Sequence, residues 1–112
     1  MFGLKVHTIQ AIQQVFAHYP ALEKALLYGS RAKGNYRTGS DIDLTLEGEN
    51  LNLSTLQKIE NDLDELMLPY KIDISLLKHI KNPELLEHIA RIGIVFYEKE
   101  APAGSEAIYT SI

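Results

Sequence analysis

Three segments of the chain place hydrophobic residues at the three-to-four-residue spacing of an amphipathic helix. They cover residues 9–19 before Pro20, 54–67 before Pro69, and 82–92 before Gly93. Ser54 and Gln57 form a predicted capping box, and Asn82 and Pro83 are the predicted N-cap and first residue of the third helix. The residues expected to face the core are Ile9, Ile12, Val15, Phe16, Tyr19, Leu56, Ile59, Leu63, Leu66, Met67, Leu85, Leu86, Ile89 and Ile92.

Short apolar or alternating segments between these helices predict strands. The expected strands are residues 24–28, 41–46, 70–76 and 94–97, with residues 31–40 as a connection. The resulting order of helix, strand, strand, helix, strand, helix, strand predicts an α/β (α+β) fold. We expect a mixed sheet with helices packed on one face, which leaves the other face open.

Carboxylates lie on the polar side of two of these strands. Asp41 and Asp43 are two residues apart, so in a strand their side chains point to the same side. Asp73 alternates with apolar neighbours in the later strand. If the two strands are neighbours, Asp73 completes a cluster of three carboxylates. Such a cluster repels itself unless it is protonated or bridged by a cation, and Mg²⁺ is the natural bridge for oxygen ligands.

The alternative for this pair is that Asp41 caps a turn and Asp43 is a solvated strand residue. Asp62 and Asp64 provide a comparison, because they have the same spacing in a helix-patterned segment. Residues two apart do not face each other on a helix, so these two are expected to be surface charges.

A Gly-Ser turn precedes the acidic strand and makes this region a candidate nucleotide site. The apolar residues 26–28 lead into Gly29 and Ser30, and ten residues separate Ser30 from Asp41. The backbone at such a turn can approach a phosphate closely, and its N–H groups and the Ser hydroxyl can bind it. Arg31 suits bidentate phosphate contacts, whereas Lys33 is as easily a solvated residue; Ser40 is a candidate to cap or orient Asp41.

The motifs at 29–34 and 40–44, with a later strand Asp at 73, resemble the polymerase-beta-type nucleotidyltransferase superfamily. Within it they are similar to the minimal nucleotidyltransferases of prokaryotes, such as the MntA-type antitoxins of MntA–HepT systems, and the resemblance spans about residues 8–98. It implies the fold of that superfamily, ATP as substrate and Mg²⁺ as cofactor, with two ions.

The resemblance also implies roles for individual residues. Asp41 and Asp43 would bridge both ions, and Asp73 would bind the ion nearest the nucleophile. Gly29 and Ser30 would hold the β- and γ-phosphates. Arg31 and Ser40 complete the predicted nucleotide-binding set, and Asp41, Asp43 and Asp73 the catalytic and metal-binding set.

Composition narrows the function classes. With 112 residues, the chain has room for one domain, expected at 1–98, and for a tail at 99–112. The net charge of −4 does not indicate a basic surface that would bind nucleic acid. No apolar segment has the length of a membrane span, and the N-terminus has no signal-peptide pattern. The absence of cysteine excludes disulfides and zinc–thiolate sites, and we expect a cytoplasmic protein. The histidines, expected to be surface or structural residues, are His7, His18, His79 and His88.

These observations favour one function and leave two alternatives. The favoured function is transfer of AMP from ATP onto a hydroxyl of a HEPN-domain toxin, with the chain acting as antitoxin. The first alternative is a binding module that only masks such a partner. The second is a transferase for a small molecule such as an aminoglycoside, for which a homo-oligomer would have to supply the missing acceptor surface.

Overall fold

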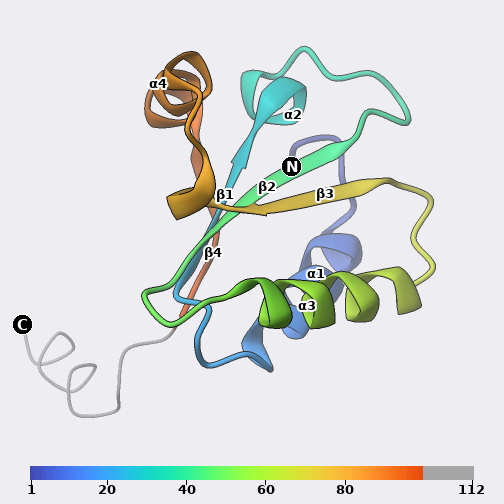
Figure 1. Cartoon of the computed structure of the whole chain (residues 1–112). Helices are drawn as coiled ribbons and strands as arrows, with labels where there is room; N and C mark the ends of the chain where they lie inside the picture. The colour runs from blue at the N-terminus through green and yellow to red at the C-terminus, as the bar shows by residue number, and fades with distance from the viewer. Residues whose placement is uncertain (100–112) are drawn as a thin grey trace, which may run out of the picture.

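A computed structural model describes residues 1–99, which form one four-stranded sheet with helices (Figure 1). The elements in chain order are α1 (Val6–Ala17), β1 (Lys24–Tyr28), α2 (Gly29–Lys33), β2 (Ile42–Glu47), α3 (Leu53–Glu65), β3 (Ile72–Leu76), the 3-10 turn η1 (Leu77–His79), α4 (Pro83–Ile92) and β4 (Ile94–Glu98). The predicted strands and longer helices are therefore present, and the predicted fold class is confirmed. The connection at 31–40 differs, because its first residues belong to α2.

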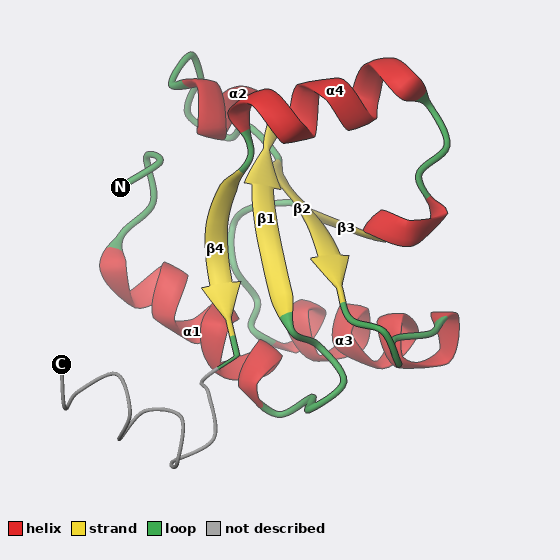
Figure 2. Cartoon of the chain, turned by 90° about the vertical axis from the view of Figure 1, so that its left-hand side faces the viewer, coloured by secondary structure: helices red, strands yellow, loops and turns green. Residues whose placement is uncertain are grey.

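The strands lie in the order β3-β2-β1-β4, with β1 at the centre beside β2 (Figure 2). β1 runs antiparallel to both β2 and β4, whereas β2 and β3 are parallel, so the sheet is mixed. The C-terminal end of β1 therefore meets the N-terminal ends of β2, β3 and β4. The sequence motifs come together at that end of the sheet.

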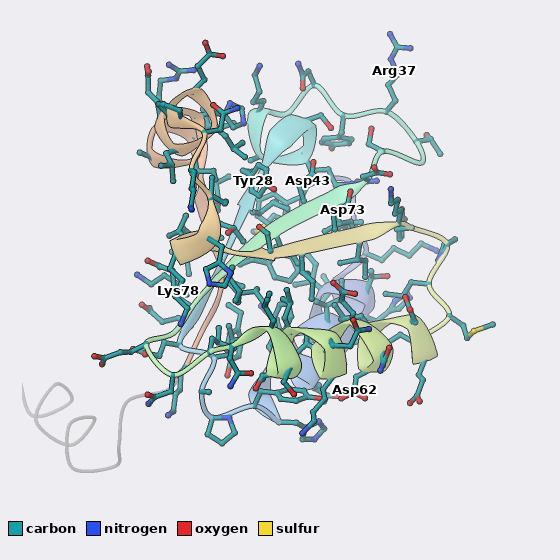
Figure 3. All side chains as sticks on the ribbon, in the orientation of Figure 1. Tyr28, Arg37, Asp43, Asp62, Asp73 and Lys78 are labelled. Carbon is teal, nitrogen blue, oxygen red and sulfur yellow. The ribbon has the colours of Figure 1, made fainter. Side chains whose placement is uncertain are left out.

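The helices divide into two pairs. α1 and α3 pack on one face of the sheet, and the fully buried Ile12, Phe16 and Ile59 meet Leu27 and Leu44 of the strands in the core. α2 and α4 lie at the end of the sheet where β1 ends (Figures 1 and 2). The face opposite α1 and α3 carries the side chains of Tyr28, Asp43 and Asp73 (Figure 3), as the alternation of the strands predicts.

Three predicted details at the helix ends and faces are wrong. α3 begins one residue earlier than the expected capping box, because Oδ1 of Asn52 accepts the Thr55 N–H at 2.8 Å and so provides the cap. Met67 is 86% exposed, since the chain leaves the helix at a left-handed φ of 55° there. Leu86 is 37% exposed on α4, because only part of that helix contacts the sheet. The predicted cap at Asn82 is confirmed by its bonds to the N–H groups of Glu84 and Leu85.

The predicted tail at 99–112 lies outside the described residues except for Lys99. Its backbone N–H donates to the Glu23 carbonyl at 2.8 Å, and its Nζ donates to the Pro20 carbonyl at 3.0 Å. These contacts join the end of β4 to the segment before β1. Within residues 1–99, the helices are too short or too polar to cross a membrane.

Candidate functional site

The two strand aspartates are neighbours in register. Asp43 on β2 pairs with Tyr28 on β1 and with Asp73 on β3, so the three side chains form a row across three strands (Figure 3). Asp41 comes directly before β2 and is exposed, whereas Asp43 and Asp73 are partly buried. The structure therefore brings two of the three predicted strand carboxylates together, whereas Asp41, which was also expected within the strand, lies one residue before it.

Charge repulsion within this cluster is concentrated on Asp43. Burial raises the pKa of the Asp43 carboxyl, and the negative charges of Asp73 and Asp41 raise it further. Lys71 opposes the effect, and its Nζ lies 3.7 Å from Oδ1 of Asp73. Because Lys71 is largely exposed, this ion pair offsets only part of the repulsion.

The donor set fits a hard cation that also binds a nucleotide. Within residues 1–99, no three or more His or carboxylate side chains are arranged as a closed metal site. Mg²⁺ does not require such a cage, because it is usually held by one or two carboxylates together with substrate phosphates and water. Asp43 and Asp73, which are in register and have the exposed Lys71 as their positive partner, supply that type of incomplete oxygen site.

Gly29 brings the backbone directly against Asp43. Its φ of 76° lies in the left-handed region, and a Cβ at this position would collide with Oδ2 of Asp43. Two features therefore favour glycine at position 29: the left-handed backbone conformation and the close approach of the backbone to the Asp43 side chain. The next side chain, Ser30, makes no hydrogen bond within residues 1–99, so its hydroxyl is available to a ligand.

The structure places Arg31 differently from the sequence expectation. Its side chain is only 2% exposed, and it donates to the Ser40 carbonyl from Nε at 3.1 Å and from Nη2 at 2.8 Å, and to the Phe2 carbonyl from Nη1 at 2.8 Å. Its guanidinium carbon lies 5.4 Å from the Tyr36 ring centroid and 5.0 Å from that of Tyr70. This geometry favours a structural clamp, and a phosphate contact by Arg31 stays a prediction.

Ser40 serves the backbone that leads to Asp41. Its carbonyl is the acceptor for Arg31, and its Oγ accepts the Arg37 N–H at 2.8 Å. Neither contact involves the Asp41 side chain, so the orientation of Asp41 by Ser40 stays a prediction. Lys33 and the Arg37 side chain are exposed, and neither cationic group has a partner within residues 1–99 (Figure 3).

Sequence reasoning missed two aromatic residues beside the site. Burial raises the pKa of the Tyr28 hydroxyl, the charge of Asp43 adds to this, and a hydrogen bond with Ser75 opposes it. Tyr28 on β1 therefore reaches across β2 to β3. His88 of α4 meets the Tyr28 ring edge-on, with centroids 6.3 Å apart. In the sequence, the position of Tyr28 directly before the Gly-Ser turn could have indicated that it lies beside the site. No sequence pattern indicated this for His88.

A comparison with protein-family models gives one match. The model described as "Polymerase beta, Nucleotidyltransferase" matches residues 10–102, which is most of the chain. No curated protein matches the sequence.

Solved structures with the same fold include toxin–antitoxin complexes. One was determined with AMP-PNP; it has a TM-score of 0.62 and 16% identity, and the match covers 96% of this chain and 82% of that chain. Another contains a tri-AMPylated HEPN toxin from Shewanella oneidensis with its MNT antitoxin; its TM-score is 0.59 at 14% identity, covering 92% of this chain and 77% of that chain. An MntA–HepT complex matches with a TM-score of 0.61 at 14% identity, covering 96% and 81%. At such low sequence identities, these structural matches show that the fold is similar.

Proposed function

Because the chain belongs to the polymerase beta nucleotidyltransferase family, we propose that it transfers AMP from ATP onto a hydroxyl group of a HEPN-domain partner protein and thereby acts as its antitoxin. The observation that carries the proposal is the row formed by Asp43 and Asp73 in register, with the Gly29 backbone pressed against Asp43. Phosphates held at the turn lie next to carboxylates in this arrangement.

The residues divide the chemistry between them. Asp43 and Asp73, with Asp41 beside them, would hold Mg²⁺, which would supply neutralisation of phosphate charge and a lowered pKa of the acceptor hydroxyl. Ser30 and the backbone that follows it would bind the β- and γ-phosphates. The acceptor oxygen attacks the α-phosphorus and releases its proton to water, while the bond from the α-phosphorus to the pyrophosphate oxygen breaks. The aspartates would set the positions of the attacking oxygen of the acceptor and of the leaving oxygen of pyrophosphate.

The choice of acceptor is supported by relatives of the same fold. A HEPN toxin that carries AMP groups was solved together with an antitoxin of this fold, and another such complex was solved with an ATP analogue. The described part of this chain has one domain and an open sheet face, so the acceptor surface must come from a partner. A partner protein that presents a hydroxyl meets that need.

The test is transfer of label from ATP to a HEPN-domain protein offered as the candidate partner. We expect label from the α-phosphate to appear on the partner, while label from the γ-phosphate leaves with pyrophosphate. Asp43→Asn removes a charge with little change of shape, and it should abolish transfer. Asp64→Asn makes the same change at an exposed site on α3 and should leave transfer intact.

The outcomes separate the alternatives. Label on the partner from the γ-phosphate without label from the α-phosphate would indicate phosphoryl transfer instead of AMP transfer. Unlabelled partner, with Mg-ATP bound normally, would exclude this partner as acceptor. Transfer by Asp43→Asn at the wild-type rate would contradict the assignment of the site.

A further inference from the structure

The backbone N–H of Gly29 is engaged by a side chain from a distant helix. It donates to Nε2 of His88 at 3.2 Å, across 59 residues of sequence. The His88 ring also lies edge-on to Tyr28, the residue before the glycine. α4 therefore holds the turn at two consecutive residues.

This hydrogen bond defines the form of His88. A ring nitrogen accepts a hydrogen bond only when it carries no proton, so Nε2 of His88 is the unprotonated acceptor in this contact. The half-buried imidazole thus acts as an acceptor for the backbone.

The turn has little support of its own at this point. Gly29 has the greatest backbone freedom of any residue type, and as the first residue of α2 its N–H has no partner within the helix. α2 has only five residues, which is too short to be stable without outside contacts. The orientation of Ser30 therefore depends on groups that hold the turn from outside.

We propose that His88 is a positioning residue for the nucleotide: by holding the Gly29 N–H, it sets the orientation of Ser30 and its distance from Asp43. The inference rests on the proposed function, because it concerns the phosphates bound at that site. His88 acts through Gly29 and does not touch the reacting atoms. The phosphates are then bound by Ser30 and its neighbours, and the Gly29 N–H stays on His88.

Two amide variants that differ by one methylene group test this. In His88→Gln the amide oxygen reaches about as far as Nε2, whereas in His88→Asn it reaches only as far as Nδ1. Calorimetry should show Mg-ATP binding weakened about tenfold by His88→Asn, because the turn is no longer held in its binding orientation, and changed less than about twofold by His88→Gln. Ala90→Asn places the same residue at an exposed position of α4 and controls for its lower helix propensity.

The NMR scalar coupling across the hydrogen bond between the Gly29 amide nitrogen and Nε2 of His88 provides a second measurement that requires no variant. In the wild-type protein this coupling should be present, and it should persist when Mg-ATP binds. Its replacement by a coupling to phosphorus on binding would show that the N–H moves from His88 to phosphate, which would overturn the proposal. The same measurement decides the question if His88→Asn fails to fold.

The remaining outcomes also decide the question. Equal affinity of His88→Gln and His88→Asn would overturn the positioning role while leaving the proposed function intact. Tighter binding by His88→Asn would mean that His88 competes with the phosphate, which also overturns it. Failure of the wild-type protein to bind Mg-ATP at all would instead overturn the proposed function, and the inference with it.

Discussion

At the scale of single residues, Asp43 combines a functional role with a cost in stability. Burial of its carboxyl, together with the charges of Asp73 and Asp41, raises its pKa above the ordinary value for an aspartate. A carboxyl with a raised pKa binds its proton more tightly in the folded state. The stabilisation that Asp43 contributes to the folded state is therefore fully present below the pKa that it has in the unfolded chain. This stabilisation is lost as the pH rises through the pKa that Asp43 has in the folded protein. At neutral pH the ionised group opposes folding.

Asp43→Asn should accordingly raise the thermal midpoint of the metal-free protein at pH 7. The gain should shrink as the pH is lowered into the range in which wild-type Asp43 becomes protonated. Differential scanning calorimetry with a chelator present measures both effects, and Asp64→Asn serves as the exposed control. A lower midpoint for Asp43→Asn at pH 7 would contradict the repulsion described for the cluster.

Asp73 should affect transfer more than binding. If it serves the acceptor side of the site, Asp73→Asn leaves Mg-ATP affinity largely intact, because Asp41 and Asp43 still hold the nucleotide side. Single-turnover kinetics should then show a strongly reduced rate, while calorimetry shows near-normal binding. Stability should change by no more than about 0.5 kcal/mol, because the carboxylate is partly exposed and its ion pair with Lys71 is long. A wild-type transfer rate would remove Asp73 from the site.

At the scale of elements, the Arg31 clamp joins α2 to the loop before β2. Arg31→Lys keeps the charge, but it cannot reproduce the forked contacts to Ser40 and Phe2 or the stacking on Tyr36 and Tyr70. We expect urea denaturation to show a loss of about 2–4 kcal/mol, because buried carbonyls lose charged donors. Arg37→Lys, at an exposed cation of the same loop, should change stability by less than about 0.5 kcal/mol.

The same variant tests the sequence expectation for Arg31. If the guanidinium contacts phosphate, Arg31→Lys should weaken Mg-ATP binding while stability stays unchanged. A stable protein with poor nucleotide affinity would therefore contradict the clamp and support the phosphate contact.

The elements themselves were largely predictable, because each strand has a regular alternation and each long helix has an apolar stripe. The neighbouring placement of Asp43 and Asp73 was conditional on strand pairing in the sequence, and the register of β2 and β3 confirms it. The cap at Asn52 was missed because the Ser54–Gln57 pair offered a competing local pattern. The burial of Arg31 was unpredictable, since its acceptors at Phe2 and Ser40 are backbone carbonyls that leave no trace in residue type.

At the scale of the whole molecule, catalysis and masking remain separable by experiment. Asp41→Ala and Asp43→Ala change the site without removing any buried apolar side chain, so both variants should fold and retain their surfaces. In cells that express the HEPN-domain partner, we expect both to fail to neutralise it, while pull-down shows normal association. Growth rescued fully by either variant would mean that association alone suffices and that transfer is dispensable.

The guanidinium of Arg31 also couples two distant parts of the chain. It holds the carbonyls of Phe2 and Ser40 at once, so the first turn of the protein and the residue before Asp41 share one side chain. A ligand that binds residues 1–4 and displaces Phe2 would change the affinity for nucleotide through the Arg31 guanidinium. By thermodynamic reciprocity, bound nucleotide would change the affinity for that ligand by the same factor. Residues 1–4 are thus linked to the loop before Asp41 through a single guanidinium group.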